Sequence, residues 1–267
     1  MKKHRLTKRI LALAAAAVMA VTALAGCGAG GSAGGDTGGS KALDTALEEA
    51  EPKVKDYAEN QQRYSGLFFD KMLKTAGEAA KLVNADSSQD DLKNAVEKLK
   101  LDSVTVANER GLIVACYPED EKGKKLKELE DKQAFYRISR NLAVKLVKDP
   151  VPVEGTKEYT VLAGVAGDKV DDNGSYAIVV SLRTDEYNKV TGADIAESCA
   201  ENTLVLSEGK VISSSMENAK VGSTTEELGI KDADVEKGSF SLTVGGTSYN
   251  CKGKVIEDYT LICAEKK

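Results

Sequence analysis

A pattern of strands and glycines occurs twice in this chain, about a hundred residues apart. The first copy is "DSVTVANERGLIVACYPEDEKGKKL" at residues 102–126, and the second is "NTLVLSEGKVISSSMENAKVGSTTEEL" at residues 202–228. Each copy contains an apolar-alternating strand, a polar turn with Gly, a second apolar strand, a polar stretch with another Gly, and a short helical run that ends in Leu. Two copies this far apart indicate two related modules in tandem rather than a solenoid, whose repeats are shorter.

The segments that follow each copy predict antiparallel sheets. "KEYTVLAGVAG" and "SYAIVVSLRT" are typical of two strands joined by a turn-rich segment, and "GSFSLTV", "TSYNCKGKVI" and "YTLICAE" predict three more strands after the second copy. Gly245-Gly246 and Glu257-Asp258 indicate short hairpin turns, and strands joined by tight turns must be antiparallel. The chain therefore predicts an α+β fold with two tandem PAS-like antiparallel-sheet modules, not a doubly wound parallel sheet.

A long helical segment precedes the modules. Between residues 41 and 84, apolar and aromatic residues recur in alternating steps of four and three, which forms a heptad-like stripe. The stripe could form the seam of a homodimer or pack on the chain's own sheet, and we favour the sheet. Pro52 predicts a kink or a fresh helix start. Further helices are expected at 91–101, at 124–148 in two pieces, and at 190–200. The stripe comprises Leu43, Leu47, Ala50, Val54, Tyr57, Gln61, Tyr64 and Phe68.

The first 27 residues predict an export signal with a lipid attachment site. A basic stretch is followed by an apolar run from Ile10 to Ala23, which is shorter than the roughly 20 residues that cross a bilayer. The run ends in Leu24-Ala25-Gly26-Cys27, which resembles a bacterial lipobox. In lipoproteins of that kind the cysteine takes a diacylglycerol, so Cys27 is the expected lipidation site. An ordinary signal peptide with a chance Cys is the alternative.

Charge and location limit the partners of the mature chain. Of the 37 Lys and Arg, five lie in the leader, which leaves 32 against 42 Asp and Glu and a net charge near −10. Such a charge disfavours nucleic acid and an anionic membrane surface. The mature protein is expected outside the cytoplasm, anchored by lipid to the bacterial cell membrane. The expected divisions are a signal peptide (1–26), a lipidated Cys with a Gly-rich tether (27–40), a helical segment (41–100), a first module (101–190) and a second module (191–267).

Histidine is absent after the leader, because the only His is His4. Ser-His-Asp catalysis, Cys-His catalysis and imidazole metal sites are therefore excluded, and nothing positions a pair of carboxylates for acid–base chemistry. We expect a binding protein rather than an enzyme, without a cofactor. The remaining cysteines match no zinc pattern and are interpreted as buried free thiols, although export would allow disulfides. They are Cys116, Cys199, Cys251 and Cys263.

Behind the long helix, "VTVANERGLIVACYPEDEKGKKL" and "YTVLAGVAG…GSYAIVVSLRT" resemble the first module of double Cache domains. These are PAS-like sensor domains of bacterial chemoreceptors and sensor kinases, and the second copy resembles their shorter, membrane-proximal module. The resemblance covers roughly residues 41–267 and implies a small-molecule ligand in the first module. Family members usually continue into a transmembrane helix and a cytoplasmic output domain, whereas this sequence stops at Lys267. A separate partner, such as a sensor kinase or chemoreceptor, is therefore implied.

The resemblance also implies ligand-binding positions. Amino-acid-binding members have an Arg-x-Trp-Tyr run where this chain has "QAFYR", so that Gln133 replaces the Arg, Phe135 replaces the Trp, and Tyr136 keeps the Tyr. Because an Arg clamps a carboxylate through two hydrogen bonds, its loss makes an α-amino acid a less expected ligand. Asp168 in "GVAGDK" matches a family Asp and could pair with an ammonium group, and the rings of Phe135 and Tyr136 could stack on a cation.

Further residues are expected at the rim of such a pocket. Arg137 and Arg140 would face one way on a helix and could bind an anion, but we favour a solvated basic face. The loop from Asp168 to Asn173 lacks the EF-hand pattern and is interpreted as a plain turn. The predicted function is sensing of a small polar metabolite, and a ligand-free structural or interaction lipoprotein of the cell envelope is the alternative. The expected rim residues are Tyr117, Arg137, Arg140 and Tyr159, with packing favoured for the tyrosines.

Overall fold

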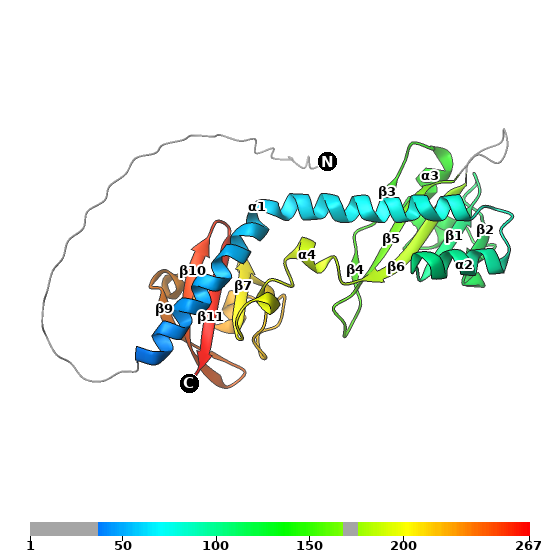
Figure 1. Cartoon of the computed structure of the whole chain (residues 1–267). Coiled ribbons are helices and arrows are strands. Elements are labelled where there is room, and N and C mark those ends of the chain that lie inside the picture. The colour runs from blue at the N-terminus through cyan, green and yellow to red at the C-terminus, as the bar shows by residue number, and fades with distance from the viewer. Residues whose placement is uncertain (1–36, 168–175) are drawn as a thin grey trace, which may run out of the picture. The chain divides into compact units, whose positions relative to one another are not determined.

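The computed structural model describes residues 37–167 and 176–267, and it begins with a long helix (Figure 1). Helix α1 (Thr37–Leu82) is followed by α2 (Gln89–Leu99), and both precede the strands. α1 continues through Pro52, so the predicted alternative of a fresh helix start there is wrong. It also begins inside the segment predicted to be a tether. The predicted signal peptide, Cys27 and the loop that carries Asp168 lie outside the described residues.

The apolar stripe of α1 packs on the chain's own sheets, as favoured from the sequence. Val54 and Tyr57 are buried against the second sheet, and Phe68 is buried against the first. An ion pair at 2.5 Å between Lys254 of the second sheet and Glu51 of α1 adds to this contact. A homodimer formed through α1 would therefore have to use other positions of the helix.

The first module is a six-stranded antiparallel sheet in the order β2-β1-β6-β5-β3, with β4 also paired to β5. One face packs against α1 and α2 through residues such as Val104 and Ile178. The opposite face, called the far face below, is covered by residues 119–147 through Phe135 and Ile138. The strands are β1 (Ser103–Ala107), β2 (Ile113–Tyr117), β3 (Leu146–Val147), β4 (Val151–Pro152), β5 (Tyr159–Ala166) and β6 (Ala177–Thr184).

Residues 124–148 were predicted to be helical in two pieces, and they form only short helical segments. Leu126 and Phe135 are both fully buried on the far face. Because they are nine positions apart, a continuous α-helix would place them on opposite sides, so burying both requires an interrupted backbone. The covering segment contains the 3₁₀ turns η1 (Glu119–Glu121), η2 (Leu126–Glu128) and η3 (Gln133–Phe135), and the short helix α3 (Tyr136–Arg140).

The second module repeats the topology of the first with a five-stranded sheet in the order β8-β7-β11-β10-β9. In both modules the first strand lies between the second strand and the last one. α1 covers one face, and residues 216–238 cover the other. The elements are β7 (Thr203–Ser207), β8 (Lys210–Ser214), α5 (Thr225–Leu228), α6 (Asp232–Glu236), β9 (Ser239–Val244), β10 (Thr247–Ile256) and β11 (Tyr259–Lys266).

The sequence repeat corresponds to a hairpin with the same hydrogen bonds in both modules. The amide of Gly123 donates to the carbonyl of Ile113 at 2.9 Å, and the amide of Gly222 donates to the carbonyl of Val211 at 2.8 Å. Both glycines have positive φ angles, 85° and 90°, which residues with a side chain rarely adopt. A second equivalent pair joins the Leu126 amide to Gly111 and the Thr225 amide to Gly209.

Residues 185–202, called the connector below, join β6 to β7 and lie against α1. They form α4 (Asn188–Thr191) and the 3₁₀ turn η4 (Ala196–Ser198), not the continuous helix predicted at 190–200. α4 ends at Gly192, whose φ of 74° is typical of a helix C-cap. A Cβ at this position would lie 2.7 Å from the ring of Tyr57, so Gly192 also lets the connector approach α1 closely.

The four cysteines of the described residues are free, as predicted. Cys251 lies opposite Ala264, and Cys263 lies opposite Lys252, so the two thiols point to different faces of the sheet. Burial raises the pKa of Cys251 to about 12 and the pKa of Cys263 to about 11. Both are therefore protonated at neutral pH. Among the described residues, no helix combines the length and the apolar character needed to cross a membrane.

Candidate ligand-binding site

The aromatic residues predicted to bind a ligand lie on two faces of the first sheet. Phe135 and Tyr136 pack on the far face. Tyr117 and Tyr159 pack on the face that contacts α1, where the Tyr159 ring lies 5.0 Å from the ring of Tyr187. These four side chains therefore do not line a common pocket.

The two arginines of α3 remain at the surface. Arg137 and Arg140 are exposed, and within residues 37–167 and 176–267 neither forms an ion pair. The neighbouring Tyr136 already has a cationic neighbour, because the ammonium of Lys127 lies 3.9 Å from the centre of its ring. Cation–π contacts of this kind use the ring face that a ligand cation would need.

Apolar side chains fill the far face where the ligand was expected. Phe135 and Ile138 are fully buried. A Cβ added at Gly164 of β5 would lie 2.5 Å from Cδ1 of Phe135 and 2.8 Å from Cδ1 of Ile138. Gly164 thus lets the covering segment contact the sheet directly, and the Phe135 ring is part of the core.

A buried polar cluster lies beside this apolar layer. Lys132 is only 4% exposed, and its ammonium pairs with the carboxylate of Glu121. The same ammonium donates to Oγ1 of Thr105 at 3.3 Å, and that hydroxyl lies 3.4 Å from Oε2 of Glu121. The three groups serve as one another's ion-pair and hydrogen-bond partners, and buried charges need such partners. None of these three residues was predicted to be a site residue.

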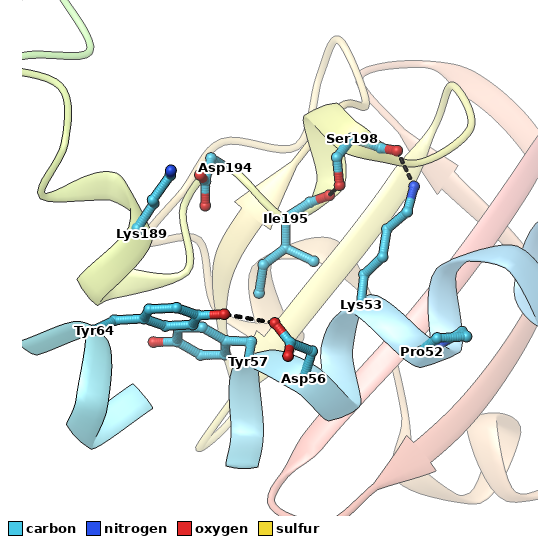
Figure 2. A pocket seen from close by; sticks show the side chains of 9 residues that line it. All are labelled: Pro52, Lys53, Asp56, Tyr57, Tyr64, Lys189, Asp194, Ile195 and Ser198. Atoms are coloured by element: carbon cyan, nitrogen blue, oxygen red, sulfur yellow. Dashed lines mark hydrogen bonds between the residues drawn. The ribbon is translucent and has the colours of Figure 1, made fainter. Parts of the chain in front are cut away.

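An open cavity of about 460 Å³ lies between α1 and the connector (Figure 2). This volume is in the usual range for sites that bind small molecules. Lysine, aspartate and tyrosine side chains dominate its walls, so both signs of charge and two aromatic rings face the same space. α1 contributes Pro52, Lys53, Asp56, Tyr57 and Tyr64, and the connector contributes Lys189, Asp194, Ile195 and Ser198.

Two charged groups of this cavity have partners within the chain. The ammonium of Lys53 donates to the backbone carbonyl of Ser198. The carboxylate of Asp56 accepts a hydrogen bond from the Tyr64 hydroxyl at 2.6 Å and another from the Asn60 amide at 3.0 Å. The bond to Asp56 raises the pKa of Tyr64, and burial raises that pKa further. These contacts hold the α1 wall of the cavity in place.

Tyr57 fixes the distance between the two walls. Its hydroxyl donates to the Val190 carbonyl of the connector at 2.9 Å, and its ring packs on Gly192. Burial raises the pKa of Tyr57 to about 12, and the negative charge of nearby Asp194 adds a smaller increase. Tyr57 is therefore a neutral hydrogen-bond donor throughout the physiological pH range.

The other two charged groups, Asp194 and Lys189, form no side-chain hydrogen bond or ion pair with the described residues. The Asp194 side chain is half-buried and the Lys189 side chain is exposed. Both belong to the connector and both line the cavity, yet they do not form an ion pair with each other within 4.0 Å. The cavity thus offers one free carboxylate and one free ammonium group.

A second, smaller cavity of about 290 Å³ shares Asp194 and is lined by Tyr159, one of the predicted rim residues.

Tyr57 and Tyr64 were predicted as part of the helical stripe but not as cavity residues. The signal was the aromatic hydroxyl at stripe positions where an aliphatic residue usually packs best. Within the described residues, no group of three His, Cys, Asp or Glu side chains could hold a metal ion.

No family model and no curated protein matches the chain. Among solved structures, the chain is similar to the sensory domain of the Campylobacter jejuni chemoreceptor Tlp3, at 13% identity over 85% of this chain and 92% of that one, with a TM-score of 0.35. It is similar to the ligand-binding domain of the Pseudomonas fluorescens chemoreceptor CtaA in complex with L-leucine, at 13% identity over 85% and 96%, with a TM-score of 0.36. It is also similar to an extracellular ligand binding receptor from Desulfohalobium retbaense, at 12% identity and a TM-score of 0.35, covering 83% of this chain and 39% of that one.

Proposed function

We propose that this chain is a lipid-anchored extracytoplasmic sensor protein that binds a small polar metabolite and signals through a separate membrane partner. The observation that carries the binding step is the cavity between α1 and the connector, with its unpaired carboxylate and ammonium. Pockets of this size with a few polar groups are the usual places where proteins bind small molecules. The absence of His after the leader favours binding over catalysis.

The location and the partner are supported by the sequence. The basic stretch, the apolar run and Cys27 occur in the order that lipoprotein signals have, and the resemblance to double Cache domains concerns proteins that report ligands across a membrane. Two sheets of the same strand order, each with one face on a long N-terminal helix, agree with that resemblance. A ligand that touches both α1 and the connector would bias how these two segments pack, which is how binding can change a conformational equilibrium.

The first module remains a second candidate for the ligand site. The polar cluster of Lys132, Glu121 and Thr105 lies on its far face, near Phe135 and Tyr136. A ligand there would have to displace or extend a cluster whose charged and polar groups are already bonded to one another. The close packing of Phe135 on Gly164 instead favours the alternative function, in which the first module is a ligand-free scaffold of the cell envelope.

A thermal-shift measurement tests the proposal. Residues 28–267, which include every described residue, are screened with a dye against amino acids, amines, organic acids, sugars and nucleobases. A ligand at 100 times its dissociation constant adds about 2.7 kcal/mol, and each kcal/mol raises the midpoint of a domain this size by roughly 2 to 4 °C.

The variants Asp194→Asn and Tyr136→Phe then separate the two candidate sites for any compound that binds. Loss of the shift in the first variant alone supports the cavity, and loss in the second alone supports the first module. A flat panel with a cooperative melting curve would instead support the scaffold function.

A further inference from the structure

We propose that the cavity between α1 and the connector selects a small zwitterion, with the ligand's ammonium group at Asp194 and its carboxylate at Lys189. The inference rests on the proposed function and specifies the chemical class of its ligand. It uses residues that lie outside the positions implied by the double Cache resemblance.

The charged side chains of the cavity differ in whether they have a partner within the chain. Of its four charged side chains, Lys53 and Asp56 are already bound within the chain, to Ser198 and to Tyr64. The two that form no hydrogen bond or ion pair with described residues have opposite signs. A ligand with a single charge would leave one of these two groups unpaired, whereas a ligand with both charges could satisfy both.

The two groups without a partner, Lys189 and Asp194, lie close together in the chain. Lys189 lies in α4 and Asp194 lies just after Gly192, so both come from one short segment of the connector. Figure 2 shows both on the connector side of the cavity, across from the tyrosines of α1, with the Lys189 side chain extending away from those tyrosines. Their separation exceeds the 4.0 Å limit of an ion pair. A zwitterion could therefore bridge two groups that do not bridge to each other.

The environment of Asp194 favours a cationic partner. This side chain is half-buried, so its unpaired carboxylate has lost part of its hydration and would gain from a cationic partner. Its charge acts on the adjacent tyrosines, since Asp194 contributes to raising the pKa of Tyr57 after burial, and that of Tyr64 after the bond to Asp56 and burial. An ammonium held there would lie near aromatic rings, which favours a cation.

The remaining wall accommodates an uncharged portion of the ligand. Ile195 and Tyr57 both line the cavity and are largely buried, so the carbon atoms that they present there form a fixed apolar part of the wall. Charged sugars, nucleotides and dianions do not combine one cationic group, one anionic group and an apolar body. Amino acids and ω-amino acids do.

Titration calorimetry with matched ligands tests the inference. The probes are the proteinogenic amino acids, β-alanine and γ-aminobutyrate, and for each compound that binds, the amine that lacks its carboxylate and the acid that lacks its amine. We expect the zwitterion to bind at least about tenfold more tightly than either partial analogue, because each analogue loses a charge-assisted contact. Equal binding of the amine or of the acid would overturn the inference.

Variants of residues 28–267 locate the contact. Asp194→Asn should weaken zwitterion binding about 10- to 100-fold, and Lys189→Gln about two- to fivefold because this lysine is exposed. The controls Asp232→Asn and Lys220→Gln remove exposed charges of the second module and should leave binding unchanged. Unchanged melting midpoints confirm that the variants are folded.

The outcomes distinguish this inference from the proposed function. If zwitterions bind and Asp194→Asn leaves their affinity unchanged, the site assignment is wrong. If a sugar, nucleobase or simple acid binds and no zwitterion does, the protein is a ligand-binding protein of another specificity. If none of these compounds binds, both the inference and the proposed function fail.

Discussion

In the first module the layer over the far face comes from residues 119–147 and contains a buried ammonium paired with a partly buried carboxylate. In the second module the corresponding layer comes from residues 216–238 and is apolar. The sheets beneath have the same strand order, and the glycine hairpins have the same hydrogen bonds. The repeat in the sequence thus corresponds to the hairpin that builds the sheet. The start of the covering layer is repeated too, through the bonds of Leu126 and Thr225, and the modules differ in the rest of that layer.

The polar cluster gives the largest expected difference between the modules. Lys132→Met should destabilise the protein by about 3 kcal/mol, because it leaves the carboxylate of Glu121 partly buried without its cation. Urea unfolding, followed by circular dichroism, measures the loss. An apolar substitution of similar size in the apolar layer of the second module, Met216→Leu, should cost less than about 1.5 kcal/mol.

The double variant Lys132→Met, Glu121→Leu provides the control for that prediction. Removing both charges should recover most of the lost stability, because no uncompensated charge remains. Equal stability of the single and double variants would mean that the pair is not coupled. The cost of Lys132→Met would then come from its other contacts, such as the hydrogen bond to Thr105.

The covering layers of the two modules contact a glycine of the sheet at different distances. A Cβ at Gly164 of β5 would lie 2.5 Å from Phe135, and a Cβ at Gly253 of β10 would lie 3.0 Å from Val235. Gly164→Ala should therefore cost about 2 kcal/mol through overpacking, and Gly253→Ala less than about 1 kcal/mol. Thermal unfolding of both variants checks the order, and a larger cost at Gly253 would reverse the comparison.

Local patterns account for what could be predicted from the sequence. The bounds of β10 match the predicted strand "TSYNCKGKVI", and β7 and β8 are the two strands predicted within the second copy, because alternating apolar residues and glycine turns act over a few positions. The extents of the helices predicted at 124–148 and 190–200 are wrong for non-local reasons, because only short helical segments form there. In one segment Leu126 and Phe135 must both reach the sheet, and in the other Gly192 must fit against Tyr57.

The cavity could not be predicted for the same reason. Its residues lie on α1 and on the connector, more than a hundred positions apart. Nothing in the local sequence of Asp194 or Lys189 marks them as unpaired, because the partners of a charged side chain depend on the tertiary structure. Phe135 was predicted from the resemblance to stack on a ligand cation, whereas its ring is fully buried in the core of the first module.

The hydroxyl of Tyr57 gives a smaller effect with a defined pH dependence. Tyr57→Phe should cost about 1 kcal/mol at neutral pH through the lost bond to Val190. Burial raises the pKa of Tyr57 from 10.0 to about 12, so this tyrosine contributes stability that is complete below pH 10 and is lost as the pH rises through 12. Urea midpoints measured from pH 8 to 12 should fall more steeply for the parent than for the variant. Parallel curves would contradict the buried position of this hydroxyl.

The smallest effect is expected at Tyr249, a buried tyrosine of β10 that packs beneath the second module's apolar layer. Its hydroxyl has no hydrogen-bond partner among the described residues, whereas that of Tyr57 is bonded to the connector. A buried hydroxyl without a partner costs free energy, so Tyr249→Phe should leave stability unchanged or raise it by up to about 1 kcal/mol. Because Tyr57→Phe removes the same atom with the opposite expected sign, the two variants form a matched pair in one urea titration. Destabilisation of equal size in both would mean that the Tyr249 hydroxyl is bonded in solution, and the second module would then have a polar contact between its sheet and its covering layer.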